Sequence, residues 1–244
     1  MGFAELLIRL GIPYGSAASV ALAEELMAFV AAESRRASRE LAAERGVFPA
    51  FDQSAFAAAG EPRRNATLNS IAPTGTLAIL AGTSPGIEPL FGLVYRREGV
   101  LNGERLLEVN PLFARLAAEC GVDLEQVVPA LAARGRLAEV PGVPEPLRAL
   151  FRTALEIPPE EHLAVQAAFQ RHVDNAVSKT VNLPHDAPPE RVASIYRAAW
   201  EAGVKGITVY RYGSRDRQVM QLGAGEPLEA REHFARCDPH DCRL

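Results

Sequence analysis

The feature that most constrains the fold is a run of three segments near the end of the chain. Two short stretches rich in β-branched residues, VSKTVNLP from Val177 and VKGITVYR from Val204, flank PPERVASIYRAAWEAG, whose apolar residues have helical spacing. A strand, a helix and a strand in this order form a βαβ unit, in which the strands run parallel and the crossover is right-handed. The sequence therefore predicts an α/β fold.

The remainder of the chain is mostly helical in pattern. FAELLIRLG predicts a short first helix, and an unbroken pattern from Ser16 to Arg45 predicts a long second one that ends at Gly46. Asn102-Gly103 between two apolar stretches is typical of a hairpin turn. Residues 110–171 contain three helical pieces, which we interpret as an inserted helical layer.

Composition limits the classes of function. The chain has 244 residues, 48% of them hydrophobic, and a net charge of −4 with scattered basic residues, so we expect a globular protein without a nucleic-acid polymer as partner. No apolar run is long enough to span a bilayer and the first residues do not resemble a leader, so we expect a cytoplasmic protein that does not contact membranes. The two lysines, Lys179 and Lys205, lie in strand-like runs, where we expect solvated side chains at strand ends.

The segment SIAPTGTLAILAGTSPGIEP, residues 70–89, places a hydroxyl-rich glycine turn directly before an apolar run. A turn that leads into a helix leaves backbone N–H groups unpaired, and with the hydroxyls of Thr74 and Thr76 around Gly75 these groups can hold an anion. An ordinary turn with threonine as the N-cap is the alternative interpretation. The turn is not a Walker motif, because no lysine follows the glycine.

Three separated stretches carry a resemblance to a known family. RNATLNSIAPTGTLAILAGTSPGIEPLF, AVSKTVNLP and GVKGITVYRYGSRDRQVM, in this order, resemble the C-terminal part of the catalytic chain of adenosylcobalamin-dependent (class II) ribonucleotide reductase, as does the initial GFAELLIRLGIPYGS. The resemblance implies the C-terminal portion of a ten-stranded α/β barrel built from two five-stranded halves, with helical additions. Residues 1–222 would form this part, and residues 223–244 a mobile C-terminal tail.

The resemblance also implies an activity. Members reduce ribonucleotides to 2′-deoxyribonucleotides by a radical mechanism, and the complete enzyme uses adenosylcobalamin as cofactor. The branch that this sequence resembles mostly uses diphosphates, so we expect a ribonucleoside diphosphate as substrate rather than a triphosphate. Substrate phosphate would bind at Thr74, Gly75 and Thr76, with Ala72 and Pro73 shaping the turn.

The family's radical loop carries an N-x-C-x-E pattern that does not occur in this sequence. We therefore expect the N-terminal part of the reductase, on another chain, to supply the radical cysteine, and this chain to be inactive alone. An inactive remnant, a truncated gene product or a non-catalytic module that binds nucleotide phosphate are the alternatives. A half barrel should also expose apolar strand faces and edges, so we expect poor solubility or self-association without its partner.

The three cysteines have separate interpretations. Cys120 lies in a helical context, where we expect a buried packing residue. Cys237 and Cys242 lie within the last eight residues, and the resemblance implies that they carry reducing equivalents from thioredoxin or glutaredoxin into the active site. Exchange of this kind needs an accessible thiolate. A metal site with His240 and an incidental pair are the alternatives, and no metal site is predicted.

Further polar residues are weaker candidates. Glu88, Lys179 and Asn182 could line the cavity of the barrel, although an ion pair with an arginine is an equal interpretation for Glu88.

Two sets of residues at helical spacing receive structural interpretations. His162, Gln166 and Gln170 recur on one face of a predicted helix and are interpreted as a polar surface, whereas Tyr196 and Trp200 are interpreted as core.

Overall fold

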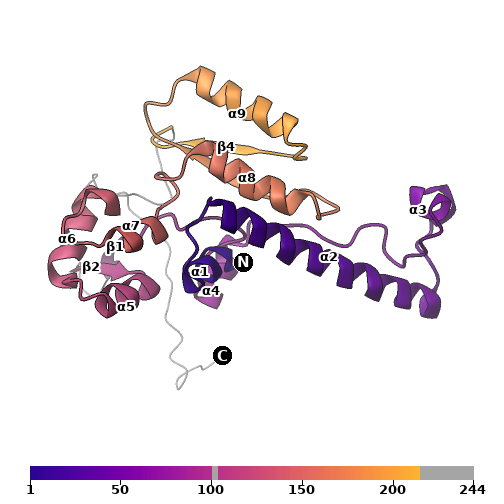
Figure 1. The fold of residues 1–244 in the computed structure, drawn as a ribbon, viewed down its shortest axis with the longest axis horizontal. Coiled ribbons are helices and arrows are strands. Elements are labelled where there is room, and N and C mark those ends of the chain that lie inside the picture. Colours follow the sequence, from indigo (N-terminus) through magenta and orange to yellow (C-terminus); the bar gives the residue numbers. More distant parts are fainter. Residues whose placement is uncertain (101–103, 215–244) are drawn as a thin grey trace.

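The computed structural model describes residues 1–100 and 104–214 (Figure 1). The turn at Asn102-Gly103 and the tail with Cys237 and Cys242 lie outside the described residues. The elements are α1 (Phe3–Arg9), α2 (Ala17–Arg45), α3 (Ala55–Ala58), α4 (Gly75–Ala81), β1 (Val94–Val100), β2 (Glu104–Val109), α5 (Pro111–Glu119), α6 (Leu124–Arg134), α7 (Glu145–Leu150), α8 (Pro159–Gln170), β3 (Thr180–Leu183), α9 (Pro189–Glu201) and β4 (Thr208–Arg211), with single 3₁₀ turns at Phe51–Gln53 and Leu137–Glu139.

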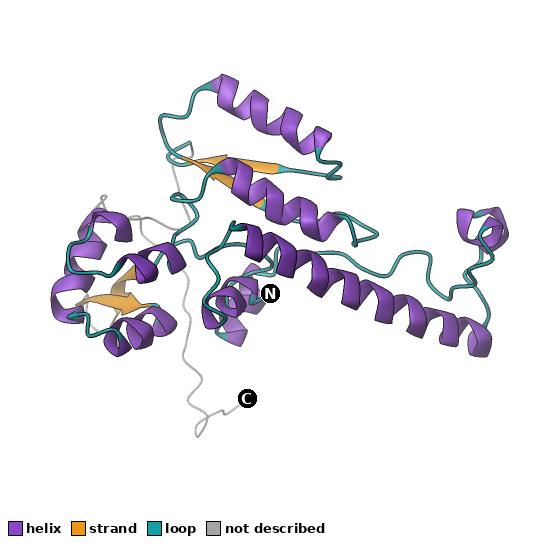
Figure 2. Ribbon diagram, in the orientation of Figure 1, coloured by secondary structure: helices purple, strands orange, loops and turns teal. Residues whose placement is uncertain are grey.

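The predicted βαβ unit is confirmed. Strands β3 and β4 pair in parallel, with Thr180 opposite Thr208, and α9 connects them. The pair lies between α8 and α9 (Figure 2). Val181 and Leu183 of β3 form a small buried cluster with Ile195 of α9, so the β-branched residues that indicated a strand also supply the apolar layer beneath the helix.

The long second helix has the predicted bounds. The hydroxyl of Ser16 accepts a hydrogen bond from the Ser19 N–H (3.2 Å), which satisfies one of the unpaired donors of the first turn. Gly46 ends the helix at a φ of 79°, a left-handed value that favours glycine. The first part of α2 packs against α8, and its second part extends away from the rest of the molecule with α3 beside its far end (Figure 1).

Helices α5, α6 and α7 form a second cluster with the β1–β2 hairpin, to which Ala4 and Ile8 of α1 also contribute. Strands β1 and β2 pair antiparallel, as the hairpin interpretation requires. Phe113 of α5 and Phe151 after α7 are fully buried and meet edge to face, with ring centroids 5.2 Å apart. Helix α8 packs instead on α2 and β3. The predicted helical layer over residues 110–171 therefore ends before α8, whose buried face belongs to the α/β part.

Three packing predictions are wrong. Tyr196 and Trp200 are 52% and 80% exposed, because the face of α9 that meets the sheet runs through Ile195 and Ala199, one position earlier in the helix. Cys120 is exposed at the end of α5. Periodicity identifies the faces of a helix, whereas the neighbouring element selects the face that is buried.

Apolar side chains are also exposed on α4. Leu77, Ile79 and Leu80 are 56%, 55% and 80% exposed. These side chains lie on a helix, so the expected exposure of strand faces and edges, and self-association, stay predictions. Within the described residues, no helix combines the length and apolar character that crossing a bilayer requires.

Candidate functional site

The Pro-Thr-Gly-Thr turn begins where a third parallel segment ends. Ile71 forms a parallel bridge with Val177, just before β3, so the turn that follows Ile71 lies alongside the chain that follows Val177. Thr74 has φ 50° and ψ 27°, the left-handed conformation, and α4 starts at Gly75. Among the described residues Thr74 is the one non-glycine residue with positive φ. The predicted glycine turn into a helix is therefore confirmed as local structure.

Thr74 does not act as an ordinary N-cap. Its side chain makes no capping hydrogen bond to α4. Its Oγ1 accepts instead from the N–H of Gly86, at 2.8 Å, across a sequence distance of twelve residues. Thr74 therefore occupies the N-cap position, but its hydroxyl does not cap α4 and instead connects two loops.

The first turn of α4 presents free hydrogen-bond donors. Within the described part of the chain, the N–H groups of Gly75, Thr76 and Leu77 meet no protein acceptor. All three residues are exposed, and so are Ala72 and Pro73 before them. Three unpaired backbone donors and the side chain of Thr76 therefore lie together in the exposed first turn of α4.

A second loop, residues 83–88, supports this turn. Gly86 has φ 50°, and a Cβ there would lie 3.1 Å from the carbonyl oxygen of Ala72, so only glycine allows the two loops to approach this closely. Glu5 of α1 accepts hydrogen bonds from the hydroxyl of Thr83 (2.7 Å) and from the N–H and hydroxyl of Ser84 (3.0 and 2.6 Å). Burial alone would raise the pKa of Glu5, and these hydrogen bonds outweigh it and lower the pKa.

The same loop ends at a buried charge cluster. Lys179 has a fully buried side chain, and its Nζ donates to Glu88 Oε2 (2.7 Å), to His162 Nδ1 (2.8 Å) and to the carbonyl oxygen of Thr180 (2.9 Å). The second oxygen of Glu88 accepts from the Thr180 N–H at 2.6 Å. The expected solvated lysine is therefore wrong for Lys179, although Lys205 is exposed. Glu88 pairs with a lysine rather than with an arginine.

His162 completes the hydrogen bonding of the lysine. Its Nε2 lies 2.9 Å from the carbonyl oxygen of Ala154 and must donate to it, which leaves Nδ1 as the acceptor for Lys179. Burial, followed by the charges of Lys179 and Arg152, lowers the pKa of His162 to about 3, so the ring is neutral near pH 7. Burial also lowers the pKa of Lys179, against the opposing effect of Glu88.

Tyr14 packs beside this cluster. Its hydroxyl donates to the carbonyl oxygen of Ile87 at 2.7 Å, and Lys179 Nζ lies 5.8 Å from the centre of its ring, within cation–π range. Burial and the nearby Glu88 carboxylate raise the pKa of the Tyr14 hydroxyl well above its ordinary value. The buried Tyr14 therefore holds Ile87, and the buried Lys179 holds the next residue, Glu88.

The polar face of α8 is buried and not a surface. His162 and Gln166 are fully buried and Gln170 is 7% exposed. Gln166 Nε2 donates to the carbonyl oxygens of Val177 (3.1 Å) and Gly206 (2.8 Å), which precede the two parallel strands. Spacing of four residues along the helix was the available signal, but the sequence alone did not reveal that strands cover this face.

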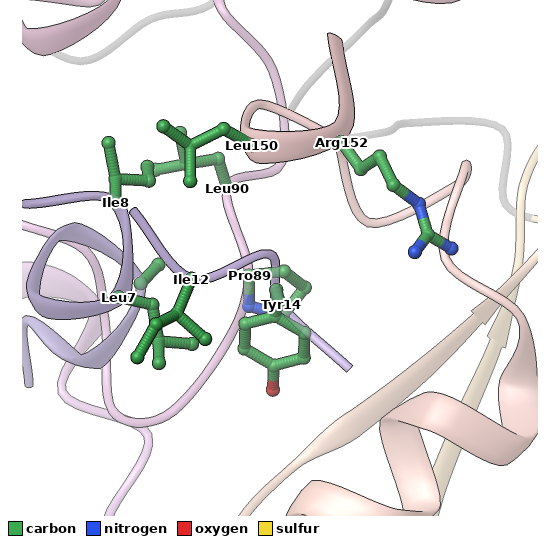
Figure 3. Close-up of a pocket in the computed structure, with 9 residues that line it drawn as sticks. Leu7, Ile8, Ile12, Tyr14, Pro89, Leu90, Leu150 and Arg152 are labelled. Carbon is green, nitrogen blue, oxygen red and sulfur yellow. The ribbon is translucent and has the colours of Figure 1, made fainter. Parts of the chain in front are cut away.

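Other candidates stay apart from this network. Asn182 lies in β3 opposite Tyr210 and is 7% exposed, and it takes no part in the Lys179 cluster. A hollow beside α1 is lined by Leu7, Tyr14, Leu90, Leu150 and Arg152, among other residues, and Leu150 lies beside Leu90 (Figure 3). The guanidinium of Arg152 points away from the aliphatic side chains. At about 10 Å³ the hollow has room for little more than one water.

Parallel strands joined by a helix, with a glycine turn at the end of a third parallel segment, define an α/β protein. The family model described as "Ribonucleotide reductase, barrel domain" matches residues 1–62 and 57–210. The chain belongs to this family, and its fold is part of that barrel domain.

Relatives agree with this assignment. The chain is 53% identical, over its whole length, to the vitamin B12-dependent ribonucleoside-diphosphate reductase of Mycobacterium tuberculosis (strain H37Rv), and 46% identical over 95% of its length to the protein of that name from Thermoplasma acidophilum. It spans 35% and 30% of these relatives, about a third of their length. The class Id ribonucleotide reductase alpha subunit of Actinobacillus ureae has the same fold, with a TM-score of 0.73 and 23% identity over 87% of this chain and 38% of that subunit.

Proposed function

We propose that this chain is a component of a ribonucleotide reductase that converts ribonucleoside diphosphates to 2′-deoxyribonucleoside diphosphates, and that its turn at residues 72–76 binds the substrate's phosphates. The observation that carries the proposal is the set of unpaired N–H groups at Gly75, Thr76 and Leu77 on an exposed turn. Such donors bind phosphate oxygens without further rearrangement. Family membership and the names of the relatives support the activity.

The remaining parts of the active site are proposed to come from elsewhere. Because the N-x-C-x-E pattern is absent from these residues, the N-terminal part of the reductase would contribute the radical cysteine. The described residues would then supply substrate binding, and the isolated chain would be inactive.

Adenosylcobalamin is proposed as cofactor of the complete enzyme, from the names of the relatives. The hollow beside α1, at about 10 Å³, cannot accommodate a corrin ring. Within the described residues no group of three His, Cys, Asp or Glu side chains is placed to hold a metal ion. We therefore assign none of the described residues to the cofactor and derive no step through it.

Replacing Thr76 by Ala should weaken binding of pyrophosphate, measured by isothermal titration calorimetry, roughly tenfold, because a hydrogen bond to a charged group contributes about 1.5 kcal/mol or more. Thr67→Ala, at another exposed threonine outside the turn, is the matched control and should bind as the wild type does. Equal affinity of the Thr76 and Thr67 variants would remove the phosphate role.

The cysteine pair outside the described residues is proposed as the route by which thioredoxin or glutaredoxin reduces the enzyme. In an assembled reductase, Cys237→Ser should abolish turnover supported by thioredoxin and retain turnover supported by dithiothreitol, since a small thiol reaches the active site directly. Cys242→Ser should behave alike, and Cys120→Ser, at an exposed helix end, should be normal in both assays. Equal loss of both activities in Cys237→Ser would contradict a shuttle.

A further inference from the structure

We propose that Lys179, Glu88 and His162 are positioning residues. They hold the turn at residues 72–76, called the phosphate turn below, in the conformation that binds phosphate. The inference rests on the proposed function for the identity of the ligand, but the positioning itself concerns the chain without ligand. Lys179 has a fully buried side chain, so its ammonium group cannot line an open cavity or touch the phosphate. Its effect on binding must pass through other residues.

The connection from Lys179 to the phosphate turn begins at the carboxylate of Glu88. Glu88 is held at both oxygens, by Lys179 at 2.7 Å and by the Thr180 N–H at 2.6 Å. His162 from α8 holds the lysine in turn at 2.8 Å. Three separate parts of the chain, namely α8, the start of β3 and the 83–88 loop, therefore meet at one ammonium group.

The second step runs from Glu88 to the turn. Gly86 lies two residues before Glu88, and its N–H donates to Thr74 Oγ1 at 2.8 Å. Gly86 also approaches Ala72 so closely that a Cβ would lie 3.1 Å from the Ala72 carbonyl oxygen. Any movement of the loop at Glu88 thus changes contacts on both sides of Pro73.

The third step is the conformation of Thr74 itself. Threonine is β-branched, and a positive φ of 50° is unfavourable for such a residue unless its surroundings hold it there. The Gly86 hydrogen bond is the contact that the structure offers at the Thr74 side chain. The direction of the free N–H groups of Gly75 and Thr76 depends on this backbone, which makes the distant cluster a determinant of phosphate affinity.

A charged cluster suits this task better than an apolar one. A buried ion pair often stabilises a fold no more than well-packed hydrophobic residues of similar volume. Its hydrogen bonds, however, specify direction as well as distance, and the ammonium group here uses all three of its donors. Directional contacts fix the loop in one position, whereas aliphatic packing would tolerate small shifts.

The test is Glu88→Gln, with two readouts by NMR and calorimetry on the 244-residue chain. The glutamine amide has only one acceptor oxygen, so it cannot accept from both Lys179 Nζ and the Thr180 N–H, and the loop should be released. We expect hydrogen exchange of the Gly86 amide to become at least tenfold faster, with exchange in α2 unchanged, and binding of pyrophosphate to weaken about fivefold. Glu24→Gln, which breaks the surface ion pair with Arg171, should change neither quantity.

Unchanged exchange at Gly86, or equal acceleration of all amides through global destabilisation, would overturn the positioning role. Glu88→Asp is the second variant if Glu88→Gln does not fold. Aspartate keeps the charge but is one methylene shorter. Hydrogen exchange of the Gly86 amide should therefore be faster than in the wild type, by a smaller factor than in Glu88→Gln, and unchanged exchange would likewise overturn the inference. If the wild type does not bind pyrophosphate, the proposed function fails, and exchange at Gly86 alone then decides whether the cluster positions the turn.

Discussion

Replacing Lys179 by Met should lower the free energy of unfolding by about 3 to 5 kcal/mol, the cost of removing one partner of a buried ion pair. The variant leaves the Glu88 carboxylate without its counter-charge and the Nδ1 atom of His162 without a donor. Urea unfolding followed by far-UV circular dichroism measures the change. The dependence of the unfolding free energy on urea concentration is compared between variants, because a change in this slope would indicate a change other than in stability.

The chain offers a matched control at its other lysine. Lys205 is exposed, and its ammonium group contacts the carbonyl oxygen of Asp174 at the surface. Lys205→Met should change stability by no more than about 0.5 kcal/mol. Equal effects at the two positions would contradict the buried cluster, because both substitutions remove the same charge from the same kind of side chain.

Lowering the pH from about 6.5 to about 4.5 should destabilise the chain by about 2 to 3 kcal/mol, mainly through His162. The pKa of His162 is lowered from 6.5 to about 3 in the folded protein. Between these values the unfolded chain binds a proton that the folded chain excludes, so the stability contributed by the neutral ring is present above pH 6.5 and is lost as the pH falls. The slope is about 1.4 kcal/mol for each pH unit.

The window above pH 4.5 separates this effect from that of the carboxylates. Hydrogen bonds lower the pKa of Glu5 below 4.5 despite its burial, so its contribution is lost only at more acidic pH. His162→Gln should flatten the stability profile between pH 4.5 and 6.5, because glutamine can accept from Lys179 and does not titrate. The exposed His185 provides the control variant His185→Gln. A wild-type profile in His162→Gln would show that other groups cause the acid loss.

The two lysines show which features the sequence could not predict, since Lys179 is buried and Lys205 is exposed although the same prediction was made for both. Both lie in short β-branched runs, and charged side chains in such runs are normally solvated. Lys179 is buried because α8 and the 83–88 loop, which are distant in sequence, bring His162 and Glu88 to it. No local pattern encodes a contact across 91 residues.

Local signals performed well wherever the structure depends on neighbours in sequence. The bounds of α2 follow from Ser16 and Gly46, and the βαβ unit follows from alternating strand and helix patterns. The turn at Thr74 and Gly75 was visible for the same reason. Its proposed phosphate role came from the residue types and the family resemblance, and stays a prediction.

The order of the main elements, the parallel strand pair, the glycine turn before α4 and the family were predictable from the amino-acid sequence, because these depend on short-range periodicity, backbone preferences and motif order. Three features became clear from the three-dimensional arrangement alone: which helix faces are buried, that the Thr74 hydroxyl accepts a hydrogen bond from the Gly86 N–H of the neighbouring loop, and that Lys179 is fully buried in a cluster of polar groups. The physical reason is that desolvation and ion pairing depend on neighbours in space, and those neighbours come from segments far apart in the chain.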